Sequence, residues 1–207
     1  MASSLINSVV YGSNCCIITV ENTLTSLGSP SDGGKRRFEK DKITICLELL
    51  KIVRPVFPGY THCTFLEFMK NSHDNFIKKS FSEGAGVGDK LVISVALKEF
   101  EDHIDFEFGD NGTGFITRGK GITFEYDKTK DMTIKDHRTG MQSGNGDALS
   151  NHINFSKIQY GGKVTIRNHS KRDGCTIKTK LPKEKVGSLK LPELQDILPE
   201  TSGSKEE

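Results

Sequence analysis

The chain has 207 residues, of which 34% are hydrophobic, and its formal net charge is only +2. This length and composition suffice for one domain with a complete core and less well packed ends. A net charge so close to zero produces no global field that would select nucleic acid or an anionic membrane, so we expect neither as a partner.

The five cysteines indicate a reducing compartment. Their number is odd and they contain no CxxC pair, which argues against a disulfide framework and against a zinc site. The sequence has no run of 18 apolar residues, and no basic segment precedes its first apolar stretch. We therefore predict a soluble, cytoplasmic protein, with secretion as a bacterial effector left open by the acidic, serine-containing C-terminus.

The first half of the chain predicts one strand and two helices. Residues 15–20 have a strand-like pattern, and the loop 25–42 is rich in Ser, Gly, Pro and charge. Residues 43–53 are a candidate helix, and residues 61–81 have helical periodicity that ends at the glycine-rich stretch 83–89.

The second half predicts two strand pairs around a long loop. Residues 90–100 and 103–110 form a predicted hairpin. The polar, aperiodic segment 115–142 is too long for an ordinary connection and is typical of a lid or of disorder. A predicted helix at 145–155 is followed by strands near 163–168 and 175–181, which together complete the expected elements.

One face of the predicted helix 61–81 gathers polar groups. With about 100° per residue, Asn71, Asp74 and Asn75 fall on the same side as Glu67, and the apolar side chains fall opposite. A solvated outer face is the alternative interpretation. Because Asn is a weak helix former, two of them in phase with a glutamate favour a functional face.

The stretch FEFGDNGTGF, residues 106–115, places an acid on an apolar strand face. Asp110 shares the period-two face of Phe106 and Phe108, where a carboxylate is costly unless it accepts hydrogen bonds. An Asx turn onto Gly112 would explain Asp110 alone. Close approach of a flat or phosphorylated ligand to the backbone would also explain Gly114.

Two alternate glycines, Gly144 and Gly146, stand where the helix at 145–155 begins. The free N–H groups at a helix start bind phosphate well. A GxG before a helix is a weak signal by itself, so its weight comes from the other motifs.

In this order, E-x-x-x-N on a helix, D-x-G-x-G after a strand, and G-x-G at a helix start resemble the motifs of the GHKL ATPase superfamily. That superfamily includes gyrase, the large heat-shock chaperones, sensor histidine kinases and the MutL mismatch-repair proteins. FLEFMKNSHDN is similar to its N-box, DNGTGF matches its G1 box, and SGNGDALSNHI is similar to its G2 box. Residues 161–182 are similar to the closing strand pair of a histidine-kinase catalytic domain.

The resemblance implies a role for each matching residue. Glu67 would orient or deprotonate the attacking group, and Asn71 would coordinate the Mg²⁺ that bridges the triphosphate of ATP. Asp110 would accept a hydrogen bond from the adenine amino group, with Gly112 and Gly114 letting the backbone close around the base. Further nucleotide contacts would come from Asp74, Asn75, Gly144, Gly146 and Thr176.

Three positions depart from the family pattern. Asp74 stands where histidine kinases commonly have Lys, which is closer to the gyrase type. The G2 box reads Gly-Asn-Gly-Asp rather than Gly-Leu-Gly-Leu, and its GDAL is similar to the GEAL of the MutL proteins. Cys175 replaces the usual small residue or Thr before Thr176. No single subfamily is therefore indicated.

The resemblance also implies a fold and a domain organisation. The expected fold is α+β, a two-layer α/β sandwich of the Bergerat type with a mixed, mostly antiparallel sheet and helices on one face. The ATP-binding domain would span residues 60–182, with a lid at about 115–142. Residues 1–59 would add an N-terminal strand, loop and helix packed on the domain, and residues 183–207 would be a flexible charged tail.

The implied function is Mg-ATP binding with ATP hydrolysis or phosphoryl transfer. A protein kinase acting on histidine or serine is one form of this activity. Because His62 lies too close to Glu67 to be the phosphoacceptor, an acceptor would be in trans, in a protein partner. A nucleotide-sensing or degenerate interaction module without turnover remains the alternative.

Overall fold

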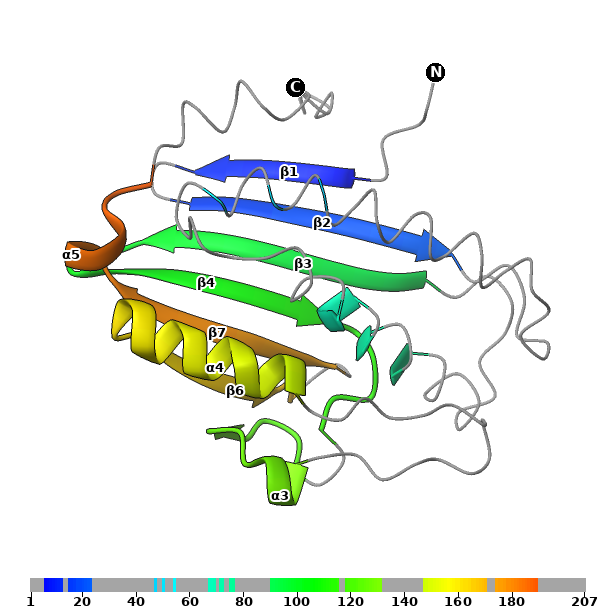
Figure 1. Cartoon of the computed structure of the whole chain (residues 1–207). Coiled ribbons are helices and arrows are strands. Elements are labelled where there is room, and N and C mark those ends of the chain that lie inside the picture. The colour runs from blue at the N-terminus through cyan, green and yellow to red at the C-terminus, as the bar shows by residue number, and fades with distance from the viewer. Residues whose placement is uncertain are drawn as a thin grey trace, which may run out of the picture.

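The computed structural model describes part of the chain, and all of its described strands belong to one sheet. The described residues are 6–12, 15–23, 47, 50, 54, 67–69, 71–72, 75–76, 90–115, 118–131, 147–170 and 174–189. The sheet has seven strands in the order β1-β2-β3-β4-β7-β6-β5 (Figure 1). Every neighbouring pair in this order is antiparallel.

The strands are β1 Ile6–Gly12, β2 Cys15–Thr23, β3 Lys90–Glu99, β4 His103–Asp110, β5 Thr123–Phe124, β6 Lys163–Asn168 and β7 Cys175–Pro182. The helices are α3 Lys128–Asp131, α4 Asp147–Tyr160 and α5 Lys183–Val186. These elements confirm an α+β fold with a mostly antiparallel sheet. The expected mixture with parallel pairs is not seen among the described strands.

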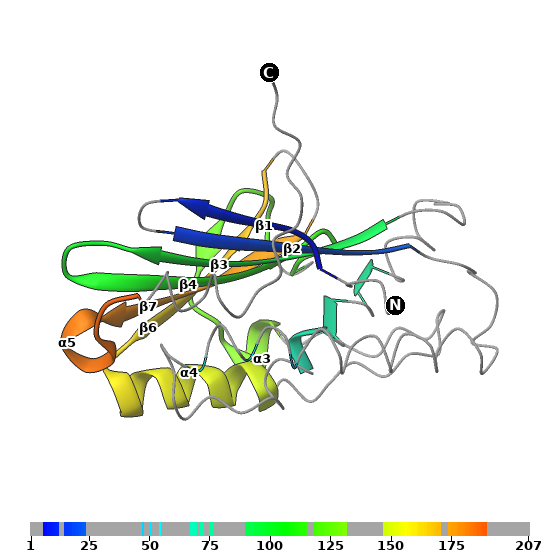
Figure 2. The ribbon, with the colours of Figure 1, turned by 90° about the horizontal axis from the view of Figure 1, so that it is seen from above.

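Helix α4 and the helical residues near 68 lie on one face of the sheet (Figure 2), and the buried core side chains come from that face and from these helical elements. The inward side chains of β3 and β4 are buried at every second position, as the period-two pattern predicts, while Ala96 and Asp105 on the opposite face are buried as well. Phe108 of β4 packs against Phe68 with ring centroids 5.2 Å apart. The Phe68 ring in turn forms a T-shaped contact with the His152 ring on α4, with centroids 5.4 Å apart. The helical residues near 68 and α4 therefore share one face of the sheet.

The predicted hairpin and the second strand pair are confirmed. β3 and β4 are joined in register from Ile93↔Asp110 to Glu99↔Ile104. β6 spans the predicted residues, and β7 extends one residue further, to Pro182. The short acidic turn between β3 and β4 is closed by the Phe100 N–H, which donates to the His103 carbonyl at 2.8 Å.

Helix α4 extends five residues beyond the predicted end at residue 155. Its buried residues are Leu149, His152, Ser156 and Tyr160. Two of these four are polar, so the apolar periodicity of the inner face is weak and the last turn is not apparent in the sequence. The helix ends where the Gly161 N–H donates to the Lys157 carbonyl at 2.9 Å, with Gly161 at a φ of +64°.

Two terminal segments differ from the prediction. β1 is an additional strand that pairs with β2, so the N-terminal segment contributes a hairpin to the sheet. Residues 183–189, expected to begin a flexible tail, contain α5 and a buried Leu189. Lys183 Nζ lies 2.6 Å from Glu99 Oε1, and the Leu189 N–H donates to Glu99 Oε2 at 3.1 Å. One carboxylate at the end of β3 thus anchors a segment that its composition alone marks as solvated.

The described part of the predicted lid contains ordered elements. β5 pairs with β6, and α3 follows it.

Within the described residues, no helix is long and apolar enough to cross a membrane. The described residues of the two predicted N-terminal helices, among them Leu47, Leu50 and the group near residue 68, are helical.

Candidate functional site

Asp110, the last residue of β4, joins two segments that are distant in sequence. Its Oδ2 accepts a hydrogen bond from Ser72 Oγ at 2.8 Å, and its Oδ1 accepts one from the Gly112 N–H at 2.9 Å. The contact with Ser72 crosses 38 residues of chain. Burial raises the pKa of the Asp110 carboxyl above its ordinary value, although both hydrogen bonds oppose that shift.

The Asx turn considered from the sequence is present at Asp110. It is the hydrogen bond from the Gly112 N–H to Oδ1. An ionised carboxylate offers about four acceptor positions. The two bonds from Ser72 and Gly112, with a third from the backbone of Cys175, use three of them. The turn is therefore compatible with one further donor on the same carboxylate.

Gly112 allows the turn after β4 to contact the helical segment formed by residues 67–69, 71–72 and 75–76. A Cβ added at this residue would lie 2.9 Å from the Cβ of Asn75 and 3.2 Å from the backbone nitrogen of Phe76. Both distances are shorter than ordinary van der Waals contact. The sequence attributes this glycine to a ligand, whereas the structure shows that the protein itself also requires it.

Gly114 has a conformational role of its own. Its φ is +68°, and an added Cβ would lie 2.9 Å from Asn168 Oδ1 and 3.0 Å from the Gly174 carbonyl oxygen. Gly174 packs against the same turn, since a Cβ added at Gly174 would lie 2.0 Å from the Asp110 carbonyl oxygen. The D-x-G-x-G stretch is thus packed between the helical segment and the β6–β7 connection.

The other helical residues of the candidate site lie beside Ser72. Glu67, Asn71 and Asn75 are half-buried and helical, and the side chains that face the core are Phe68, Met69, Ser72 and Phe76. Glu67 and Asn71 are four residues apart, so they lie one turn apart on the same side of the helix. The structure therefore places both at the boundary between the buried face and solvent.

Ser72 is a site residue that the sequence reasoning missed. It is 2% exposed and lies on the apolar side of the helix, about 140° from Glu67 at 100° per residue. A hydroxyl at such a position requires a hydrogen-bond partner. That requirement was a signal in the sequence, although nothing local identified Asp110 as the partner.

Thr176, expected beside the adenine, lies on the other face of the sheet. It pairs with Gly109 of β4, and its Oγ1 lies 2.8 Å from Nε2 of His169. Since neighbouring strand residues point to opposite faces, the side chain of Asp110 is on the side away from Thr176. The structure does not bring these two side chains together.

Cys175 occupies the position beside Asp110 instead. Its thiol is buried, and burial together with the charge of Asp110 raises the pKa of that thiol well above its ordinary value. Alternation along β7 contained the signal for this placement. Cys175 is in phase with the buried Thr179 and Leu181, whereas Thr176 is not.

The first residues of the predicted lid are held by Asn168, at the end of β6. Its Oδ1 accepts from the Phe115 N–H at 3.0 Å, and its Nδ2 donates to the carbonyls of Phe115 at 2.9 Å and Arg118 at 3.0 Å. Arg118 continues the chain of contacts through two hydrogen bonds to the buried Asp131, at 2.6 and 3.2 Å. This part of the loop therefore has defined side-chain anchors.

Three predicted site residues, Asp74, Gly144 and Gly146, lie outside the described residues, as does the stretch 132–142 of the predicted lid. The described residues contain no group of three or more His, Cys, Asp or Glu that could hold a metal ion. The expected Mg²⁺ would be held by the Asn71 amide oxygen and by phosphate oxygens, which such a group does not include.

No known family model matches this chain, and no curated protein matches it significantly.

Proposed function

We propose that this chain is a GHKL-type domain of the Bergerat fold that binds Mg-ATP between its sheet and its helical face. The observation that supports this best is the 2.8 Å hydrogen bond between Ser72 and Asp110. It joins the N-box-like helix to the G1-like turn, two motifs that the sequence relates only by their order. The helical segment and α4 on one face of an antiparallel sheet are the layers that this fold requires.

The base would be recognised by Asp110. Its carboxylate ends β4 beside the half-buried helical residues and accepts hydrogen bonds from the protein on both oxygens. Donors from Ser72 and Gly112 favour the ionised form, which can accept a further hydrogen bond from an exocyclic amino group. A buried acceptor of this kind discriminates against bases that present an oxygen there, because the carboxylate would face a second acceptor.

The phosphates would lie toward the helix that carries Glu67 and Asn71. The amide oxygen of Asn71 is a suitable ligand for Mg²⁺, which would offset part of the triphosphate charge when bound. Glu67, one turn earlier, would orient or deprotonate the attacking water or hydroxyl group. Asp74, Asn75, Gly144 and Gly146 complete the proposed contacts.

Titration calorimetry with Mg-ATP tests the base contact through Asp110→Asn. The variant replaces one acceptor oxygen by an NH₂ group that would face the adenine amino group, and we expect affinity to fall at least about tenfold, or about 1.4 kcal/mol. Asp102→Asn is the matched control, because Asp102 is 75% exposed just before the other end of β4. Equal affinity for Mg-ATP in the wild-type chain and in Asp110→Asn would refute the proposed role of Asp110.

Turnover is tested separately, by phosphate release with and without a candidate protein acceptor. We expect release by the wild-type chain, and we expect Glu67→Gln to lose it while retaining Mg-ATP binding. Binding without release or transfer would instead assign the chain to nucleotide-sensing modules. Absence of binding is tested by thermal unfolding, since ligand at about 100 times its Kd adds about 2.7 kcal/mol of stability.

A further inference from the structure

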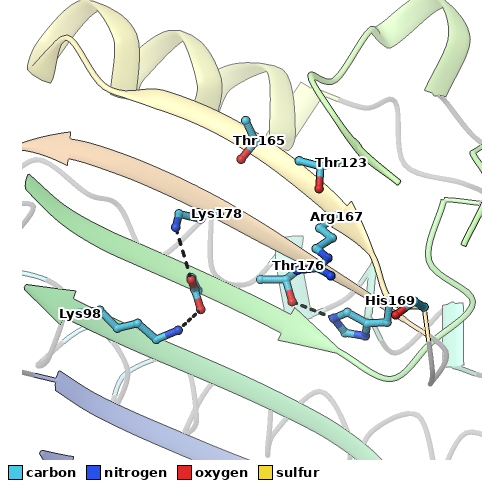
Figure 3. A pocket seen from close by; sticks show the side chains of 9 residues that line it. Lys98, Thr123, Thr165, Arg167, His169, Thr176 and Lys178 are labelled. Atoms are coloured by element: carbon cyan, nitrogen blue, oxygen red, sulfur yellow. Dashed lines mark hydrogen bonds and ion pairs between the residues drawn. The ribbon is translucent and has the colours of Figure 1, made fainter. Parts of the chain in front are cut away.

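The face of the sheet that points away from the Asp110 carboxylate carries a cavity of about 550 Å³ (Figure 3). Its lining residues are Lys98, Glu107, Thr123, Thr165, Arg167, His169, Ser170, Thr176 and Lys178. They come from strands β3, β4, β5, β6 and β7 and from the residues just after β6. A volume of this size is within the range of pockets that hold small ligands, about 300–1,000 Å³.

The two lysines of the cavity are already neutralised by carboxylates. Lys98 Nζ lies 2.7 Å from Glu107 Oε2, and Lys178 Nζ lies 2.5 Å from Oδ2 of Asp105. The Asp105 carboxylate that pairs with Lys178 is 1% exposed, so its position is set by the surrounding side chains. These ion pairs offset the positive charges of both lysines.

Arg167 is the remaining cation. It is exposed on β6 between the buried Ile166 and Asn168, and none of the described residues forms an ion pair with it. Its guanidinium carries five N–H donors in a fixed planar arrangement that matches the oxygens of a phosphate or carboxylate group. The cavity therefore has one cation whose charge the described part of the protein does not offset.

Hydroxyl groups flank Arg167 on both sides. Thr123 of β5 and Thr176 of β7 are its direct cross-strand partners, so the three residues form one row across the sheet. Directly paired residues have Cβ atoms about 4.5–5.5 Å apart, which is close enough for one small group to contact all three. The His169 ring, bonded to Thr176, borders the row, and Thr165 lies on the same strand face as Arg167.

We propose that this cavity binds a small phosphorylated sugar or polyol, with its phosphate group on Arg167. The row of Thr123, Arg167 and Thr176 presents one guanidinium and two hydroxyl groups; the three terminal oxygens of a phosphate can meet all three groups, whereas a carboxylate has two oxygens. Apart from the imidazole of His169, the described lining contains no aromatic ring and no large apolar side chain, so it suits a hydroxyl-rich body rather than a base or an acyl chain. This cavity is separate from the proposed nucleotide site, which lies across the sheet.

The test is a titration of the full ¹⁵N-labelled chain with glucose 6-phosphate, in which the NMR chemical shifts of the backbone amides are measured at each step. We expect saturable shifts at Thr165, Arg167 and Thr176. Unphosphorylated glucose should produce no saturable shifts, and inorganic phosphate should bind more weakly than glucose 6-phosphate. Saturable shifts confined to the turn at Gly112, or no saturable shift up to high millimolar glucose 6-phosphate, would overturn the proposal.

Two variants that remove the same formal charge separate this site from general attraction. Arg167→Gln should weaken glucose 6-phosphate binding at least about tenfold, because a charge-assisted contact is lost. Lys163→Gln, on the same strand but outside the cavity and paired with Glu125 at 2.7 Å, should change it by less than about twofold. Equal weakening by both variants would overturn the proposal, as would tighter binding of gluconate, which carries a carboxylate instead of a phosphate.

Discussion

The contact between the turn after β4 and the helical segment can be tested by one added methyl group, in Gly112→Ala. The new Cβ would lie 2.9 Å from the Cβ of Asn75, whereas ordinary contact begins at 3.4 Å. Its other neighbours are backbone atoms of Asn75 and Phe76, at 3.3 and 3.2 Å, so no flexible side chain can move aside. The turn or the helical segment must therefore shift by about half an ångström, as the overlap at Asn75 requires.

The expected cost follows from two terms. Overpacking of this kind typically costs about 1–3 kcal/mol. The displacement also weakens the hydrogen bond from the Gly112 N–H to Asp110, and bonds to charged groups contribute about 1.5–3 kcal/mol when complete. Since the shift relieves part of the overlap while retaining part of the bond, we expect a loss of about 2–3 kcal/mol in the free energy of unfolding.

Urea denaturation, monitored by circular dichroism, measures this loss in the free energy of unfolding. The matched control is Gly119→Ala. Gly119 is exposed, and an added Cβ would meet only Ile122 Cγ1 at 3.5 Å, an ordinary contact. The control should remain within about 1 kcal/mol of the wild-type chain, because it changes mainly the entropy of the unfolded state. If Gly112→Ala unfolds at the same urea concentration as Gly119→Ala, the two motifs are not packed together as described.

Two further predictions concern buried polar side chains. Asn168→Ala removes three hydrogen bonds of 2.9–3.0 Å to Phe115 and Arg118, so we expect a loss of about 2–3 kcal/mol in urea unfolding. Asn154→Ala, at an exposed position of α4, is its control, and equal stability of the two variants would contradict the anchoring role. Burial lowers the pKa of His152 to about 3, so the folded state stays neutral where the unfolded state, with a pKa of about 6.5, takes up a proton. Stability should therefore fall by about 2 kcal/mol between about pH 7 and pH 5, and a His152→Gln variant with the same pH slope would refute that cause.

The strands show how much of this fold can be predicted from local pattern. β3, β4, β6 and β7 were predicted nearly to their ends because one buried face imposes a period of two on the side chains. β1 and α5 were not predicted, since β1 is defined by its pairing with β2 and α5 by contacts to Glu99. The last turn of α4 was missed because part of its buried face is polar.

The candidate site was predictable in its motifs and less so in its contacts. Helical spacing put Glu67 and Asn71 on one side, and period two put Asp110 on the inner face of β4, as the structure has them. The partner Ser72 was missed because its hydrogen bond spans 38 residues and leaves no local pattern. Alternation along β7 excluded Thr176 from that face and indicated Cys175, although the motif led to the opposite choice.

The stretch from Phe106 to Phe115 shows which features the sequence determined and which ones the tertiary structure determined. The sequence by itself determined an apolar strand ending in an acid, a turn that needs glycine, and the order of these features after a polar helix face. These properties depend on covalent geometry and on periodicities within a few residues. Only the tertiary structure decided that Gly112 meets the helical segment, that Gly114 meets Asn168, and that an open row of hydroxyls and Arg167 lies on the reverse of the sheet. Those contacts depend on strand register and helix packing, where a shift of one residue turns every side chain to the other face.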